Sequence, residues 1–357
     1  METPDGSVIG EGGKVLHFSS RRFVRDICFD GACFVCGAAR GSVPFNNEHV
    51  VPDWLLRRHK LHEQKITLPN LTTYKYGAYK VPCCVSCNSL LGKSVEQRVS
   101  ALLTGDYSEI RSRLSFETIT LLFSWMALLY VKTHLKDGGL SLNRKSAEKL
   151  KLGDIYDWAS LHHAHAIARL AYTHTALSET ALGTVLVLPA QQAPYFQDFD
   201  YGDLYDYQTV FVRTGSVCII AVLNDSCGAL NLARDWFERL RGNLTPIQMR
   251  EIMAQIAYCN ACLAQRPTFS TTTTPDGKTE IVADVPKRPT VSEPGNAVRG
   301  SLLEYCLDHL LKGMPNEKWV RARVREARYS FVFNQDGSFN ESSMHPAPAP
   351  GAKEVDS

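Results

Sequence analysis

Two closely spaced cysteine pairs constrain the fold of this chain more than any other feature. Cys33 and Cys36 form the first pair, and Cys84 and Cys87 form the second. Two thiolates in one tight turn can supply half of the tetrahedral ligand set that zinc prefers. We therefore predict that these four cysteines hold a structural Zn²⁺ ion. The adjacent Cys83 could replace Cys84 as a ligand, but only Cys84 is separated from Cys87 by two residues. The alternative to a zinc site is two unrelated pairs of reduced thiols.

A short motif with an acidic residue and a histidine lies between the two cysteine pairs. It reads Glu48-His49-Val50-Val51-Pro52, and Asn88 follows Cys87 directly. Over residues 28–97, this order of motifs resembles the HNH endonucleases, which are small ββα-metal nucleases with a zinc-binding support. The resemblance implies cleavage of DNA. Nothing after about residue 100 contributes to it.

The resemblance assigns roles to three residues. His49 would be the general base that activates water, since an imidazole titrates near neutral pH. Glu48 and Asn88 would hold a catalytic Mg²⁺ or Mn²⁺ ion through oxygen atoms. In the alternative interpretation, His49 only packs in the fold, Glu48 is a surface acid, and Asn88 caps the helix that follows it.

One departure from the family pattern, and one additional acidic residue, bear on this prediction. Residues 76–82 contain no asparagine, although the middle asparagine of the HNH signature belongs there. Tyr79, Lys80 or the backbone is expected to take its place. Glu96, eight residues after Asn88, could reach the metal, with a solvated helical face as the alternative.

Basic side chains near the motif are candidate contacts for phosphate, and an ordinary charged surface is the alternative. These are Arg57, Arg58, His59, Lys60, His62 and Lys93. Local patches of this kind are needed, because the formal net charge of the chain is only +2. Bulk charge alone would not hold nucleic acid.

The cysteine content favours a reducing, cytoplasmic environment. The chain has 11 cysteines, an odd number, and its first residues show no secretory leader. The third pair, Cys259 and Cys262, falls in a helical pattern and is expected to be two buried thiols. His162, His163 and His165 do not share one helical face, so a second metal site there is not expected.

The predicted fold class is α+β, with a zinc-braced ββα module followed by a mainly helical region with a small antiparallel sheet. We expect a disordered lead-in (1–14), the HNH module (15–105), an α+β region (106–340) and a disordered tail (341–357). The main segments follow as a list. Helices are expected at 94–103, 116–135, 144–150, 156–175, 231–241, 246–263, 302–312 and 317–328; strands at 184–189, 208–213 and 216–223; a ribbon at 266–286 turning at 275–277.

The apolar run 119–131 is too short to span a bilayer and is expected to be a buried core helix. The predicted function is therefore a metal-dependent DNA endonuclease, in a setting such as restriction or phage defence, without a membrane partner. The alternatives are a non-catalytic zinc module that binds nucleic acid or protein, and an RNA-cleaving enzyme. The C-terminal region would select the substrate, bind a protein partner or form a homo-oligomer.

Overall fold

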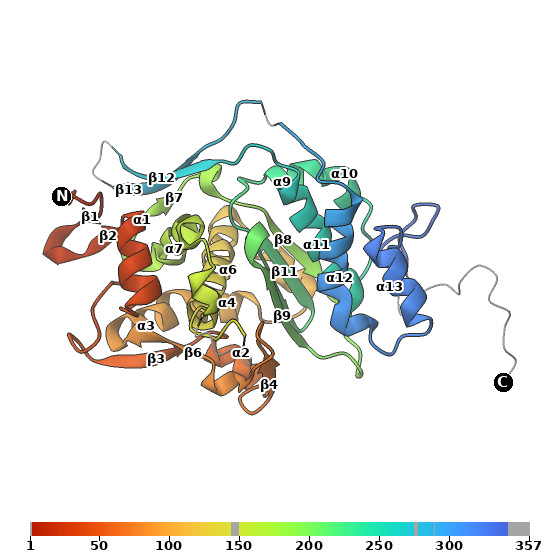
Figure 1. Ribbon diagram of the computed structural model, residues 1–357, viewed down its shortest axis with the longest axis horizontal. Helices are drawn as coiled ribbons and strands as arrows, with labels where there is room; N and C mark the ends of the chain where they lie inside the picture. Colours follow the sequence, from red (N-terminus) through yellow and green to blue (C-terminus); the bar gives the residue numbers. More distant parts are fainter. Residues whose placement is uncertain (1, 144–149, 275–277, 289, 342–357) are drawn as a thin grey trace, which may run out of the picture. The chain divides into compact units, whose positions relative to one another are not determined.

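The computed structural model describes residues 2–143, 150–274, 278–288 and 290–341 (Figure 1). They form a mixed α+β fold, as predicted, which divides into two compact units. Unit 1 consists of Met1–Thr104, Ser112–Leu182 and Thr268–Asp284. Unit 2 consists of Gly105–Arg111, Gly183–Pro267 and Val285–Ser357. The predicted module 15–105 is thus one part of a larger, discontinuous unit.

A β-hairpin and a helix form the part of unit 1 that carries the motif. Strand β3 (Phe45–His49) pairs antiparallel with β6 (Lys80–Cys84), and His49 lies opposite Lys80. Helix α3 (Val85–Leu91) follows at once. It continues through the π-helical segment Gly92–Glu96 into α4 (Gln97–Leu102). This is the ββα arrangement that the resemblance to HNH nucleases implied.

The connection between β3 and β6 is itself structured. Helix α2 (Asp53–Arg58) follows the motif, and a small hairpin of β4 (Lys65–Thr67) and β5 (Thr73–Lys75) comes next. A 3₁₀ turn, Tyr76–Ala78, leads into β6. Its entry is fixed to the loop before β4, because the Gly77 amide donates to the His62 carbonyl over 3.1 Å.

Helix α6 (Phe116–Asp137) is the core helix of unit 1. Ser115 and Thr118 form a capping box that fixes its start. Its length and composition would allow a membrane span, but 72% of its most apolar window is buried within the structure. It packs against β6, α4, the π-helical segment and α7 (His162–Ala168). This supports the prediction of a buried core helix.

The start of the chain differs from the prediction. The described part of the lead-in is ordered, with β1 (Val8–Ile9) paired to β2 (Val15–His17). The reason is a local polar network: Ser7 is buried, and its hydroxyl accepts a hydrogen bond from the Ser19 amide over 3.0 Å. Residues 144–149, 275–277 and 342–357, which include a predicted helix, a turn and most of the predicted tail, lie outside the described residues.

The remaining elements of unit 1 include a second sheet, whose strand order is β12-β13-β7. Strand β13 pairs antiparallel with β12 and parallel with β7, which confirms the predicted ribbon on either side of its turn. The other bounds follow: α1 Ser20–Arg22, the π-helical Phe23–Phe29, α8 Leu170–Thr173, β7 Ala176–Leu177, β12 Thr268–Thr273, β13 Thr279–Asp284, and the 3₁₀ turns Glu11–Gly13, Leu152–Asp154, Trp158–Leu161 and Glu179–Ala181.

Unit 2 is built on a four-stranded antiparallel sheet with the order β8-β11-β10-β9. Helices α11 and α12 lie side by side next to it, and α11 packs on β10 and β11 (Figure 1). The central strands β10 and β11 are buried along their whole length. The strands expected at 184–189, 208–213 and 216–223 are confirmed, as are the helices expected at 246–263, 302–312 and 317–328. The single helix expected at 231–241 is instead divided into two short helices, α9 and α10. The bounds are β8 Val185–Pro189, β9 Phe199–Leu204, β10 Thr209–Thr214, β11 Val217–Val222, α9 Gly228–Leu232, α10 Arg234–Phe237, α11 Pro246–Ala261, α12 Asn296–Leu311, α13 Glu317–Arg325 and the 3₁₀ turn Tyr205–Tyr207, while α5 (Tyr107–Ser112) spans the boundary of the units.

Candidate functional site

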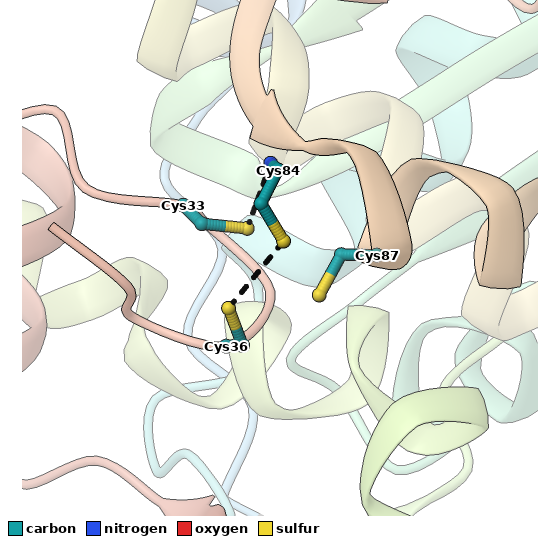
Figure 2. Close-up of side chains that lie close together, drawn as sticks. All are labelled: Cys33, Cys36, Cys84 and Cys87. Carbon is teal, nitrogen blue, oxygen red and sulfur yellow. Dashed lines mark hydrogen bonds between the residues drawn. The ribbon is translucent and has the colours of Figure 1, made fainter. Parts of the chain in front are cut away.

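The four predicted zinc ligands converge in unit 1. The Sγ atoms of Cys33, Cys36, Cys84 and Cys87 all lie within 4.8 Å of one another and face a common point (Figure 2). The Cys36 and Cys84 sulfurs are 3.7 Å apart. Bonds of about 2.3 Å to one tetrahedral zinc ion would place sulfurs about 3.8 Å apart. The cluster therefore could bind a structural zinc ion.

The neighbouring thiol of Cys83 is not a member of this group. It is fully buried, and its sulfur lies 3.9 Å from that of Cys33. Cys84, at the end of β6, supplies the fourth sulfur and also donates its backbone N–H to the Cys33 sulfur over 3.4 Å. The two-residue spacing to Cys87 thus identified the right cysteine.

Two buried side chains from the following helices hold the first cysteine turn. His165 donates from Nε2 to the Phe34 carbonyl over 2.6 Å, and Arg169 donates from Nε to the Val35 carbonyl over 2.5 Å. Burial lowers the pKa of His165 well below its ordinary value, so the ring is neutral and carries one N–H donor. His162 likewise bonds the Phe18 carbonyl over 2.6 Å. These contacts were not predicted, because no local pattern links a helix near residue 165 to a turn near residue 34.

His49 lies at the end of β3 in a half-buried position. Burial, and then the positive charge of Lys80, lower the pKa of its imidazole. The ring is therefore neutral at neutral pH and has a free electron pair to accept a proton. This is the protonation state that a general base requires.

Two further side chains meet His49. Ligand atoms of His49, Asp53 and His62 lie within 4.8 Å of one another. The His62 Nε2 atom is 2.9 Å from Asp53 Oδ1, and the two imidazole rings meet edge to face with centroids 6.2 Å apart. His62 was among the predicted basic residues, whereas Asp53 was missed. Its place four residues after His49, at the start of α2, was the available signal.

This group can act in two chemical ways. Two imidazoles and a carboxylate are a donor set that transition metals accept. However, Asp53 also forms an ion pair with Arg57, which offsets its negative charge. Proton transfer suits the group better, because a divalent cation gains little from a carboxylate that is already neutralised.

A cavity of about 270 Å³ adjoins the hairpin. Its lining includes Arg40, Asn47, Lys80 and Lys136, together with Ala78, Val81, Pro82 and Leu135. Lys80 connects it to the histidine, since it lies opposite His49 in the β3–β6 pair. Three cationic side chains without a carboxylate in the lining create a positive potential that attracts anions such as phosphate.

Glu48 occupies a different environment from the one predicted. Its side chain is buried and forms an ion pair with Lys132 of α6, with Oε1 3.0 Å from Nζ. The Glu96 carboxylate is 3.5 Å from the same nitrogen. Burial raises the pKa of Glu96 to about 7, and the nearby Glu48 carboxylate adds to this effect while Lys132 opposes it.

Asn88 is engaged elsewhere as well. Its amide nitrogen donates to the Asn46 side-chain oxygen over 3.0 Å. A divalent ion shared by Glu48 and Asn88 would have to displace Lys132 from Glu48, so these residues do not fit that ion as they are folded. Their role as cation ligands stays a prediction that the geometry does not favour.

A backbone hydrogen bond fixes the loop that follows His49. The amide of Val50, directly after His49, donates to the Tyr79 carbonyl over 3.0 Å. The Tyr79 hydroxyl in turn donates to Asp137 over 2.6 Å and is buried with it. The loop that follows the histidine is thereby fixed to β6 and to the end of α6.

The predicted phosphate contacts separate into two kinds. Arg57 is paired with Asp53 beside His49, and Lys60 and Lys93 are exposed. Arg58 is committed to the fold, because it donates to the Leu103 carbonyl over 2.9 Å. The structure therefore leaves Lys60 and Lys93 exposed to a ligand, whereas Arg57 and Arg58 are engaged within unit 1.

No protein-family model matches the chain, and no curated protein or solved structure is significantly similar to it.

Proposed function

We propose that unit 1 hydrolyses phosphodiester bonds in DNA, with His49 at the reacting centre. One observation carries the proposal: a neutral, half-buried imidazole lies at the end of a hairpin that a four-cysteine cluster braces, next to a cavity lined by cations. The imidazole can take a proton, and the cations can hold the phosphate. The resemblance to HNH nucleases adds to this geometry.

In the proposed reaction, His49 accepts a proton from a water molecule whose oxygen attacks phosphorus. The bond to the leaving sugar oxygen breaks, and that oxygen takes up a proton. His62 is placed to supply it, because its Nε2 atom is held by Asp53 and its ring meets that of His49 edge to face. Lys80, Lys136 and Arg40 would offset the negative charge that grows on the phosphate oxygens.

The same proposal assigns Zn²⁺ to the cysteine cluster in a structural role. Four thiolates leave no open position for substrate, which is typical of structural zinc sites. The ion would keep α3 and the cysteine turn in place under the hairpin. No step is assigned to a Mg²⁺ or Mn²⁺ ion on Glu48 and Asn88, because Lys132 is already paired with the Glu48 carboxylate.

Cleavage assays with the purified full-length protein test the proposal. Supercoiled plasmid and linear single-stranded DNA are incubated with wild type, His49→Ala and His174→Asn. His174 is an exposed histidine at the end of α8, and asparagine tolerates its left-handed backbone, so it serves as the matched control. We expect cleavage by wild type and His174→Asn, and a loss of about 10²–10⁴-fold in His49→Ala, the usual contribution of a general base. Equal activity of all three chains would contradict the proposal.

RNA of the same sequence is included in the assay as a separate arm. The proposed proton transfer can act on either kind of phosphodiester, so the two substrates have to be compared directly. Cleavage confined to RNA, and dependent on His49, would support the predicted alternative of an RNA-cleaving enzyme.

A second candidate function is a non-catalytic zinc module that binds nucleic acid or protein. The observation that favours it is the ion pair of Glu48 with Lys132, which engages one of the predicted catalytic carboxylates. Binding of DNA without cleavage, measured by fluorescence anisotropy and unchanged in His49→Ala, would support this candidate. Restriction or phage defence stays a predicted setting for either function.

A further inference from the structure

Lys132 is the most deeply buried cation near the reacting centre. It lies on α6, its side chain is 0% exposed, and it is one of the largest fully buried side chains in the described part of the protein. Burying an ammonium ion is costly unless it is paired and hydrogen-bonded. Its partners should therefore account for its charge and for its N–H groups.

Three oxygen atoms surround the ammonium nitrogen. Lys132 donates to Glu48 Oε1 over 3.0 Å and to the His49 carbonyl over 2.7 Å, and Glu96 Oε1 lies 3.5 Å away. An ammonium has three N–H groups; two of them have acceptors in Glu48 and the His49 carbonyl, while Glu96 Oε1 forms an ion pair with the nitrogen without a hydrogen bond. The two carboxylates outweigh the effect of burial and raise the pKa of Lys132, which keeps the group charged.

The oxygen set is one that a hard divalent cation would accept. Mg²⁺ and Mn²⁺ bind carboxylate and carbonyl oxygens, and two carboxylates supply the charge that such an ion needs. The two carboxylates come from separate elements, β3 and the π-helical segment Gly92–Glu96. A π-helical segment shifts the side chains that follow it relative to an α-helix, and it places Glu96 toward Lys132.

We propose that the Lys132 ammonium takes the position between Glu48 and Glu96 that a divalent cation bound by these two carboxylates would take. Unit 1 then carries its own cation at this place, and Glu48 is not a ligand of Mg²⁺ or Mn²⁺. The ammonium also holds the carbonyl of His49, so Lys132 is a positioning residue for the imidazole. The proposal deepens the proposed function but can be tested without it, because it concerns the binding of an ion.

Direct binding of Mn²⁺ to the zinc-loaded, full-length protein tests the proposal by electron paramagnetic resonance of the free ion. Wild type is compared with Glu48→Gln, which keeps the size of the side chain and removes its charge. We expect the two proteins to bind Mn²⁺ equally, including the case in which neither binds it. Binding by wild type that is lost in Glu48→Gln would overturn the proposal.

A second variant tests whether the position is suited to a metal ion. Lys132→Ala frees the two carboxylates, so we expect it to gain a Mn²⁺ site that is lost again in the Lys132→Ala/Glu48→Gln protein. Lys93→Ala is the matched control, since Lys93 is exposed on the same helical run as Glu96. A folded Lys132→Ala protein that binds no more Mn²⁺ than wild type would also overturn the proposal.

One further variant locates any ion that wild type does bind. His49, Asp53 and His62 are another possible group of ligands, and Asp53→Asn weakens that group without changing Glu48. Loss of Mn²⁺ in Asp53→Asn but not in Glu48→Gln supports the proposal. If Lys132→Ala does not fold, the comparison of wild type with Glu48→Gln still decides the question, and neither readout depends on cleavage of DNA.

Discussion

Glu48 and His49 are neighbours in sequence, yet their side chains have different surroundings. Successive side chains of a strand point to opposite faces. Glu48 is directed to α6, where Lys132 neutralises it, whereas His49 meets Asp53 and His62. The acid-histidine pair of the motif is therefore split between a buried ion cluster and a half-exposed site. The role of each residue therefore depends on which face of strand β3 its side chain occupies.

The titration of His49 is the first prediction at this scale. Burial, followed by the charge of Lys80, lowers its pKa, so the imidazole should lose its proton below the usual value of about 6.5. Lys80→Gln removes one of these causes and should move the midpoint upward. Proton-carbon NMR of labelled histidines, assigned with His49→Ala, measures both. A midpoint above 6.5 in wild type would contradict the prediction.

At the scale of elements, polar side chains fix where a helix begins, and burial of the cap against the rest of the fold supports it. Thr245 caps α11, and its hydroxyl accepts a hydrogen bond from the Gln248 amide while Gln248 bonds back to the Thr245 amide. Both residues are almost fully buried. Threonine followed by proline and an apolar helical pattern is the local sequence signal of such a cap.

Thr245→Ala should therefore weaken unit 2. Loss of an N-cap side chain typically costs about 0.5–2 kcal/mol of unfolding free energy. Urea unfolding followed by tryptophan fluorescence measures the change. Ser301→Ala is the control, since Ser301 is exposed within α12 and bonds only to its own helix. An unchanged midpoint for Thr245→Ala would show that the cap contributes nothing.

At the scale of the whole molecule, the two units have different sources of stability. Unit 1 contains the cysteine cluster, buried ions such as Lys132, and the apolar helix α6. Unit 2 relies on a continuous apolar core formed by its sheet, α11 and α12. Removal of a metal ion should therefore affect the two units unequally.

Hydrogen exchange after chelation of zinc tests this difference. We expect faster exchange in β3, β6 and α3, because the cysteine cluster joins α3 and β6 to the first cysteine turn. Exchange in β10 and β11 should stay slow, since these strands are buried along their whole length. Addition of Zn²⁺ should restore the original rates. Equal acceleration in both units would contradict a structural metal confined to unit 1.

Sequence reasoning succeeded where the signal was local. Cysteine spacing identified the cluster, and the apolar runs on either side of residue 215 identified the strands of the β10–β11 hairpin. It missed contacts between distant segments. Lys132 lies 84 residues from Glu48, and nothing near Glu48 shows that a cation will arrive from α6. The same limit hid the support that His165 gives to the first cysteine turn.

The division of unit 1 into separate chain segments has a consequence for biosynthesis. Strand β7 pairs with β13. Next to this pair, the side chains of Thr175 and Thr279 share a hydrogen bond, although the two residues are 104 positions apart in the sequence. At roughly 5–20 residues per second, a ribosome needs about 5–20 s to translate that interval. During this time the edge of β7 has no partner strand, because the intervening residues 183–267 leave the ribosome before β13 does. A nascent chain halted before residue 284 would thus present an incomplete sheet to chaperones.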